Sequence, residues 1–191
     1  NIMKYIKFFI VCLFFINCKA QTIVNITDYQ LTEDSSNKYF KDLDNNYSNF
    51  VGTWEYTNSG ITFRLILWKK QNVKIDMVDD IHYMDILEAK FQIVQNANLP
   101  NEIIKHDSVK FYPQNGSTSD TILTGFNINS NLCMGTFTDN CANGGNGIID
   151  GSCGLKKLST DTIRFTLKKI GKLLPTETFS VPTDCILTKV N

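Results

Sequence analysis

The alternation of hydrophobic and polar residues changes period along the chain, and each change predicts a different element. Residues 8–16 form an unbroken apolar run. Residues 33–50 are polar, with aromatic and aliphatic residues at helical offsets, which predicts one or two helical turns. From Val51 onward the period becomes two, most clearly over residues 61–68, where apolar side chains alternate between two faces. This alternation predicts β-strands for the remainder of the chain.

Short strands separated by turn residues fill the chain after residue 50. Residues 82–95 carry charges spaced as in an amphipathic helix, but their second half favours a strand. Turns rich in Asn, Gly, Ser and Pro separate further predicted strands at 108–112, 121–127, 132–138, 148–158, 162–170 and 179–190. Eight to ten short strands in this arrangement predict an all-β antiparallel meander. Because closure would remove exposed sheet edges, we expect a barrel domain over residues 50–191.

The N-terminal residues 1–20 are typical of a secretory signal peptide. Lysines precede an apolar run of nine residues, which is shorter than the roughly 20 residues of a membrane-spanning helix. Two processing routes are open: cleavage after Ala20, which is favoured, or lipid attachment at Cys18 as in bacterial lipoproteins. Cleavage would leave residues 21–49 as an extended and helical lead-in. We therefore expect a protein of the periplasm, the outer-membrane surface or the extracellular space, with a membrane contact only through Cys18.

The remaining cysteines are Cys133, Cys141, Cys153 and Cys185. In an oxidising compartment an even number of cysteines predicts disulfides, and three connectivities are open. If residues 140–146 form a hairpin loop, Cys133 lies opposite Cys153, and Cys141 is left for Cys185. Zinc is not expected, because no Cys-x-x-Cys or short Cys/His spacing is present.

Composition narrows the function classes. The 191 residues suit a single domain, and the 42% hydrophobic content suits a packed core. Nineteen basic and nineteen acidic residues leave no net charge for nucleic-acid binding. Only two histidines and two arginines are present, and no Gly-x-Ser-x-Gly elbow occurs. The acidic and glycine-rich residues 139–150 have the outline of a calcium loop, but a cysteine at its third position favours a plain hairpin. We expect no enzyme activity, no metal and no cofactor.

The segment Gly52-Thr53-Trp54 at the start of the first strand resembles the opening signature of lipocalins and related calycins. In that family the glycine allows a tight entry into the strand, and the tryptophan closes one end of the barrel beneath an arginine from a late strand. Arg164 is the arginine in that position here, so the resemblance implies a Trp54–Arg164 cation–π contact. The family's second motif, Thr-Asp-Tyr, occurs only at residues 27–29, before the first barrel strand.

A second resemblance covers nearly the whole mature chain. The segments FVGTWEYTNSGITFRLILWKK (residues 50–70) and FSVPTDCILTKV (residues 179–190) resemble an uncharacterised family of small exported flavobacterial proteins. This resemblance implies a Bacteroidota host, an exported destination and a single β-rich domain. It carries over no catalytic residue.

Three functions follow as hypotheses, in order of preference. The first is a monomeric, non-catalytic binding protein that holds a small apolar or amphipathic ligand inside the barrel. The second is a cell-surface structural or interaction domain whose barrel is filled by its own side chains. The third is a hydrolase of unknown type. Candidate ligand-contacting residues for the first hypothesis are Phe63, Arg64, Leu65, Leu67, Phe165 and Leu167.

Overall fold

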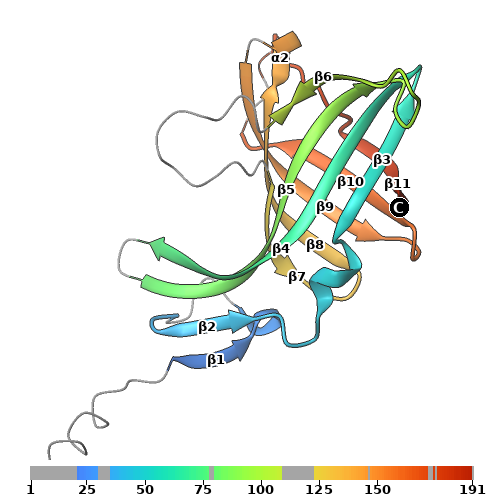
Figure 1. Ribbon diagram of the computed structural model, residues 1–191. Helices are drawn as coiled ribbons and strands as arrows, with labels where there is room; N and C mark the ends of the chain where they lie inside the picture. The colour runs from blue at the N-terminus through green and yellow to red at the C-terminus, as the bar shows by residue number, and fades with distance from the viewer. Residues whose placement is uncertain are drawn as a thin grey trace, which may run out of the picture.

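The chain is almost entirely β-structure in the computed structural model, which describes residues 21–29, 35–77, 80–108, 123–145, 147–171, 174 and 176–190 (Figure 1). Its strands are β1 (Thr22–Asn25), β2 (Lys38–Lys41), β3 (Gly52–Asn58), β4 (Ile61–Met77), β5 (Asp80–Gln95), β6 (Ile103–Asp107), β7 (Leu123–Ile128), β8 (Leu132–Cys141), β9 (Gly147–Lys157), β10 (Thr162–Lys169) and β11 (Asp184–Val190). The helical elements are single turns: η1 (Ile26–Asp28), η2 (Asn46–Asn49) and α2 (Ala142–Gly145).

Eight of the described strands form a closed antiparallel barrel. They neighbour one another in the order β3, β4, β5, β7, β8, β9, β10 and β11, and β11 pairs with β3 to complete the circuit. The joint between β5 and β7 is short, and the Tyr47 hydroxyl lies across it, 3.2 Å from the Asp85 carbonyl and 3.1 Å from the Gly125 carbonyl. The predicted all-β antiparallel meander, closed into a barrel, is therefore confirmed.

Strands β4 and β5 continue beyond the barrel and form a small second sheet with the lead-in. Strand β2 pairs in parallel with β5 at Tyr39–Tyr83 and Phe40–Met84, and β1 pairs in parallel with β2. Figure 1 shows this sheet projecting at the base of the barrel. The helical turns predicted for residues 33–50 are wrong over β2, because the free edge of β5 offers backbone partners that outweigh local helix propensity. Only the single turn η2 remains helical.

A buried ionic network attaches the lead-in to β4 and β5. Lys69 Nζ lies 3.0 Å from Asp42 Oδ2 and 3.4 Å from Asp85 Oδ2, and neither aspartate side chain is exposed. The Tyr39 hydroxyl donates to Asp85 at 2.6 Å, and backbone N–H groups of residues 42, 46, 47 and 72 complete the coordination of the two carboxylates. The two carboxylates share one ammonium and accept hydrogen bonds from neutral groups, so loss of one partner would leave a buried charge without compensation.

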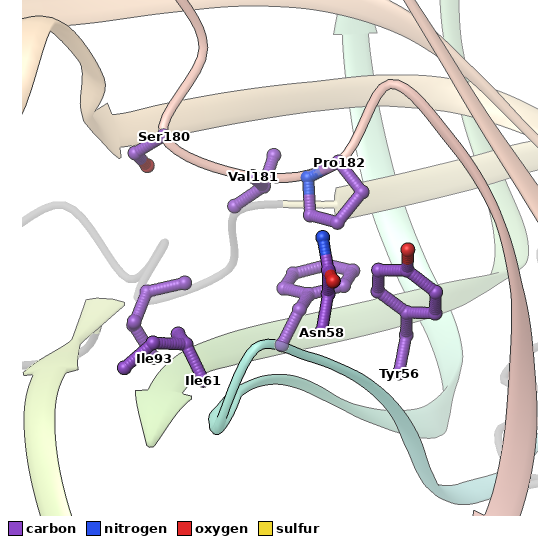
Figure 2. A pocket seen from close by; sticks show the side chains of 8 residues that line it. Tyr56, Asn58, Ile61, Ile93, Ser180, Val181 and Pro182 are labelled. Atoms are coloured by element: carbon purple, nitrogen blue, oxygen red, sulfur yellow. The ribbon is translucent and has the colours of Figure 1, made fainter. Parts of the chain in front are cut away.

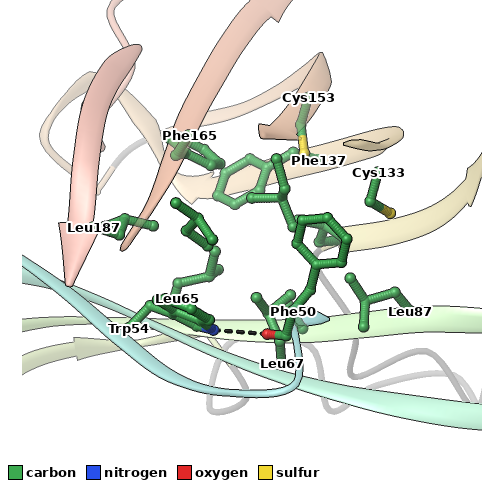
Figure 3. Packing of buried hydrophobic residues seen from close by; sticks show 14 of the residues in the cluster. Phe50, Trp54, Leu65, Leu67, Leu87, Cys133, Phe137, Cys153, Phe165 and Leu187 are labelled. Atoms are coloured by element: carbon green, nitrogen blue, oxygen red, sulfur yellow. Dashed lines mark hydrogen bonds between the residues drawn. The ribbon is translucent and has the colours of Figure 1, made fainter. Parts of the chain in front are cut away.

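The barrel interior is packed with phenylalanine. The rings of Phe63, Phe91, Phe137 and Phe165 contact one another in a closed cycle, with centroid separations from 5.4 to 6.0 Å. Each of these side chains is at most 3% exposed. Such offset and edge-on contacts are the favoured aromatic geometries, and they fill the width of an eight-stranded barrel. Figure 3 shows two members of this cycle, Phe137 and Phe165, above Leu65 and Trp54.

Trp54 closes the end of the barrel opposite the β3–β4 hairpin. Its indole Nε1 donates to the Phe50 carbonyl at 2.7 Å, the dashed bond in Figure 3. The cation over its ring is Lys189, with Nζ 5.3 Å from the centroid. The expected Trp54–Arg164 pair is therefore wrong: Arg164 is on the outer face of β10, half exposed, and bonded to Asp184. Outward alternation along β10 excludes it from the interior.

Gly52 is required where the chain enters β3. Its φ of +133° lies in a region that L side chains rarely adopt. An added Cβ would also lie 2.8 Å from Lys189 Cε. Glycine at this position therefore allows both the tight entry into the strand and the passage of the Lys189 side chain toward Trp54.

The four described cysteines are free thiols, so the predicted disulfides are not formed. The register explains the first pair: Cys133 lies opposite Leu155 and Cys153 opposite Gly135, which places the two thiols diagonally. Cys185 lies opposite Phe165 in the core, and Cys141 lies at the far end of β8. Burial raises the pKa of Cys153 and of Cys185 to about 12, so these thiols remain protonated.

The outcomes of the other sequence predictions concern the signal peptide and three predicted strands. The signal peptide with Cys18 and nearly all of the strand predicted at 108–112 lie outside the described residues. The strand predicted at 179–190 begins only at Asp184, because Pro182 cannot donate a ladder hydrogen bond. Residues 82–95 form β5, which confirms the strand over the helix.

Candidate functional site

A cavity of about 300 Å³ opens at the mouth of the barrel, the end opposite Trp54. It is lined by Tyr56, Asn58, Ile61, Phe63, Ile93, Ser180, Val181 and Pro182. Figure 2 shows residues of the β3–β4 hairpin and Ile93 on one side, with Ser180, Val181 and Pro182 facing them from the segment before β11. The cavity thus lies between a rigid hairpin and a segment without regular secondary structure.

Strand alternation places the hairpin side chains in the cavity. Tyr56 and Asn58 follow Trp54 at two-residue intervals along β3, and Ile61 precedes Phe63 by the same interval on β4. Phe63 pairs with Tyr56 on one side and with Ile93 of β5 on the other. Because Phe63 also belongs to the phenylalanine cycle, the cavity ends where the packed interior begins.

The opposite wall is residues 180–182, which are held against β8. The fully buried Asp139 of β8 accepts bonds from the Ser180 N–H at 2.6 Å and the Ser180 hydroxyl at 2.7 Å. Just after β8, Asn143 of α2 exchanges two hydrogen bonds with Thr178, and Val181 is 5% exposed. The segment before β11 is therefore fixed at the mouth by one buried carboxylate and one reciprocal amide pair.

The lining combines apolar and neutral polar surface, with the polar share slightly the larger. Four aliphatic residues and two aromatic rings contribute the apolar part, and none of the eight lining residues carries a charge. The polar groups are the Tyr56 hydroxyl, the Asn58 carboxamide and the Ser180 hydroxyl. Small-molecule sites are concave and carry a few placed polar groups, and this cavity is at the small end of their usual volume range with a more polar lining than most.

The structure separates the residues that sequence analysis had grouped as ligand contacts. Phe63 lines the mouth cavity, so it stays a predicted ligand contact. The side chains of Leu65, Leu67, Phe165 and Leu167 point into the barrel but belong to its packed core, with at most 7% exposure. Their contribution is to fill the interior, so the space for a ligand lies above them and not among them.

The prediction that Arg64 contacts a ligand is wrong. Its side chain lies on the outer face, between the inward-pointing Phe63 and Leu65, where strand alternation requires it to be. Its two terminal nitrogens bond both carboxylate oxygens of Glu102 at 2.9 and 3.0 Å, and its Nε bonds Glu55. These bonds raise the Arg64 pKa and lower that of Glu102 to about 2. The Arg64 guanidinium group therefore connects the barrel wall to the loop at residues 96–102.

His82 and His106 are both buried and both structural. The His82 side chain is fully buried between Tyr29 and Phe40, with Nδ1 3.0 Å from Asp80 Oδ2. His106 stacks on Phe91 and bonds Asn140 across the mouth. Both lie in the strands that attach the lead-in or β6 to the barrel.

Residues 139–150 form the β8–β9 hairpin that was favoured over a calcium loop. Asn143 and Gly144 take the left-handed conformation at its turn. The Asp139 carboxylate accepts hydrogen bonds from Ser180 and from the Cys141 N–H, and the Asp150 carboxylate accepts one from the Thr138 hydroxyl. Within the described ranges, no group of three His, Cys, Asp or Glu residues could hold a metal ion.

Sequence reasoning missed most of the cavity lining. Tyr56, Asn58 and Ile93 lie in predicted strands, and their alternation with Trp54 and Phe63 would have placed them inside. The contribution of Ser180, Val181 and Pro182 depends on the Asp139 anchor, which connects positions 41 residues apart. Pro182 inside a predicted strand was the one local signal that this segment leaves the sheet.

Comparison with known proteins gives a family without a function. A model of DUF6705, described as a family of unknown function, matches residues 3–190. The chain belongs to this family. Membership covers nearly the whole chain and confirms the expectation of a family of unknown function, whereas the flavobacterial origin and the lipocalin resemblance stay predictions. No curated protein and no solved structure matches the chain. Among the described helices, none is long and apolar enough to cross a membrane.

Proposed function

We propose that this DUF6705 protein is an exported, non-catalytic binding protein that holds a small apolar or amphipathic ligand in the mouth cavity. The observation that carries the proposal is the cavity of about 300 Å³ between the β3–β4 hairpin and residues 180–182. The apolar side chains of its mixed lining would contact the body of such a ligand, and its neutral polar groups would orient it. Export is supported by the signal-like residues 1–20.

A second candidate is an interaction or structural protein with a filled barrel. The phenylalanine cycle favours it, because four buried rings in mutual contact occupy the barrel interior at that level. Near the mouth, Leu99, Ile103 and Ile104 are each about half exposed and would suit contact with another protein. The two candidates differ in one measurable property, the occupancy of the mouth cavity by a small molecule.

Native mass spectrometry of the protein purified from its own host tests the first candidate. We expect an adduct that is lost on denaturation. An Ile61→Trp variant should lack the adduct, because Ile61 is 42% exposed at the cavity and tolerates a larger side chain that fills it. Ile186→Trp is the matched control, since Ile186 is similarly exposed on the outer face of β11. A bare mass for the unmodified chain would favour the second candidate.

A further inference from the structure

Ser180 has a specific hydrogen-bonding state at the cavity wall. Its hydroxyl has one proton, which it donates in a charge-assisted hydrogen bond to the Asp139 carboxylate 2.7 Å away. Toward the cavity, the Ser180 oxygen therefore presents lone-pair density and no proton. A ligand group that meets it must donate a hydrogen bond.

The negative charge of Asp139, which lies behind Ser180, also favours a ligand group that donates a hydrogen bond. Asp139 is fully buried and directly behind the wall, and its partners among the described residues are the Ser180 N–H and hydroxyl and the Cys141 N–H, which are all neutral. Among the described residues, no cation forms an ion pair with this carboxylate. In a site of low dielectric constant it repels an anion and attracts the positive end of an O–H or N–H dipole.

The other lining residues offer no positive charge to pair with an anionic ligand. None of the eight is Lys, Arg or His, and the Asn58 carboxamide and Tyr56 hydroxyl offer only neutral hydrogen bonds. A carboxylate that left water for this cavity would lose its hydration without gaining an opposite charge. A neutral molecule has no such cost, and its apolar body would lie on Phe63, Ile93 and Val181.

From these three observations we infer that the mouth cavity selects neutral apolar molecules that carry a hydroxyl or amide N–H donor, and that it rejects carboxylates such as fatty acids. The inference rests on the proposed function, because it names the ligand class of the same cavity. The donor of the ligand meets the Ser180 oxygen, and the acceptor of the same ligand is served by Asn58 or Tyr56.

The test uses three probes with one fluorescent skeleton: naphthylmethanol, naphthoate and methylnaphthalene. Fluorescence titration of the unmodified protein should give the tightest binding for the alcohol and about tenfold or weaker binding for the carboxylate. A Ser180→Ala variant should bind the alcohol about threefold to tenfold more weakly and leave methylnaphthalene unchanged. Ser180→Thr keeps the hydroxyl and should keep the preference for the alcohol.

Controls separate the failure of this inference from the failure of the proposed function. Ser152→Ala on the exposed face of β9 should change no affinity, and circular dichroism verifies the fold of every variant. Binding of naphthoate as tight as that of the alcohol would overturn the inferred ligand class while the binding function stands. An alcohol preference that survives in a folded Ser180→Ala variant would overturn the role of Ser180. If the cavity binds none of the three probes, both the proposed function and the inference fail.

Discussion

At the residue scale, the closed end of the barrel shows how one structural role can pass between residue types. The lipocalin resemblance implied an arginine over Trp54, and the structure has Lys189 there instead. Lys189 reaches the indole because it pairs with Trp54 where β11 lies beside β3. Gly52 has no side chain that would block the path of the Lys189 side chain. The role was predictable from the sequence motif, whereas the residue depended on the register between β11 and β3.

The position of Lys189 over Trp54 predicts that removing the Lys189 charge lowers the free energy of unfolding more than removing the Arg164 charge. Lys189→Met keeps the aliphatic stem but removes the charge over the indole, and should lower the free energy of unfolding by about 0.5–2 kcal/mol. Arg164→Met removes only a half-exposed surface ion pair, for which about 0–1 kcal/mol is typical. Urea unfolding followed by Trp fluorescence measures both. A larger loss for Arg164→Met than for Lys189→Met would contradict the geometry at Trp54.

At the element scale, the strands were predictable and the lead-in was not. Alternation in residues 61–68 and 162–170 fixes which side chains face inward, and it places Phe63, Leu65 and Leu167 correctly. The same alternation places Arg64 on the outer face, whereas a ligand contact inside the barrel would need it to point inward. Strand β2 escaped prediction because its pairing partner, β5, is more than 40 residues away. A local helical pattern cannot indicate a long-range parallel pairing.

The ionic network that holds β2 predicts a pH-dependent stability. Burial by itself raises the pKa of Asp85, but hydrogen bonds from Tyr39 and from backbone N–H groups, with the Lys69 cation, bring it below the ordinary value of 3.8. A lowered carboxyl pKa stabilises the folded state above the unfolded-state pKa. That contribution is complete above about pH 5 and is lost as the pH falls below 3.8 through the folded-state value.

Replacement of Asp85 tests this dependence. Asp85→Asn should lower the free energy of unfolding at about pH 6 by about 1.5–3 kcal/mol, the range for hydrogen bonds to a charged group. The difference from the unmodified chain should shrink at about pH 3, where the native carboxyl begins to protonate. Asp76→Asn is the control, because Asp76 is 65% exposed and pairs only with Lys74 at the surface. Equal losses at both pH values would contradict the role of the Asp85 charge.

At the scale of the whole molecule, the barrel is divided into a packed interior and an open mouth. Sequence analysis could predict a barrel, and it left open whether the barrel was hollow or filled. That choice depends on how side chains from opposite walls meet, as Phe63 meets Phe165 and Phe91 meets Phe137. Contacts across a barrel leave no trace in the alternation along any one strand, so the division could not be derived before the fold was known.

Removal of one ring from the phenylalanine cycle tests the packed interior. Phe137 contacts both Phe91 and Phe165 and is fully buried, so Phe137→Ala should cost about 3–5 kcal/mol in unfolding free energy. The cavity left behind is apolar, and such cavities bind benzene, so benzene should raise the melting temperature of the variant and not that of the unmodified chain. Phe126→Ala, at a partly buried position on β7, is the control and should lose less stability. A small loss at Phe137, with no effect of benzene, would mean that the interior is loosely packed, and the ligand site would then extend from the mouth into the barrel.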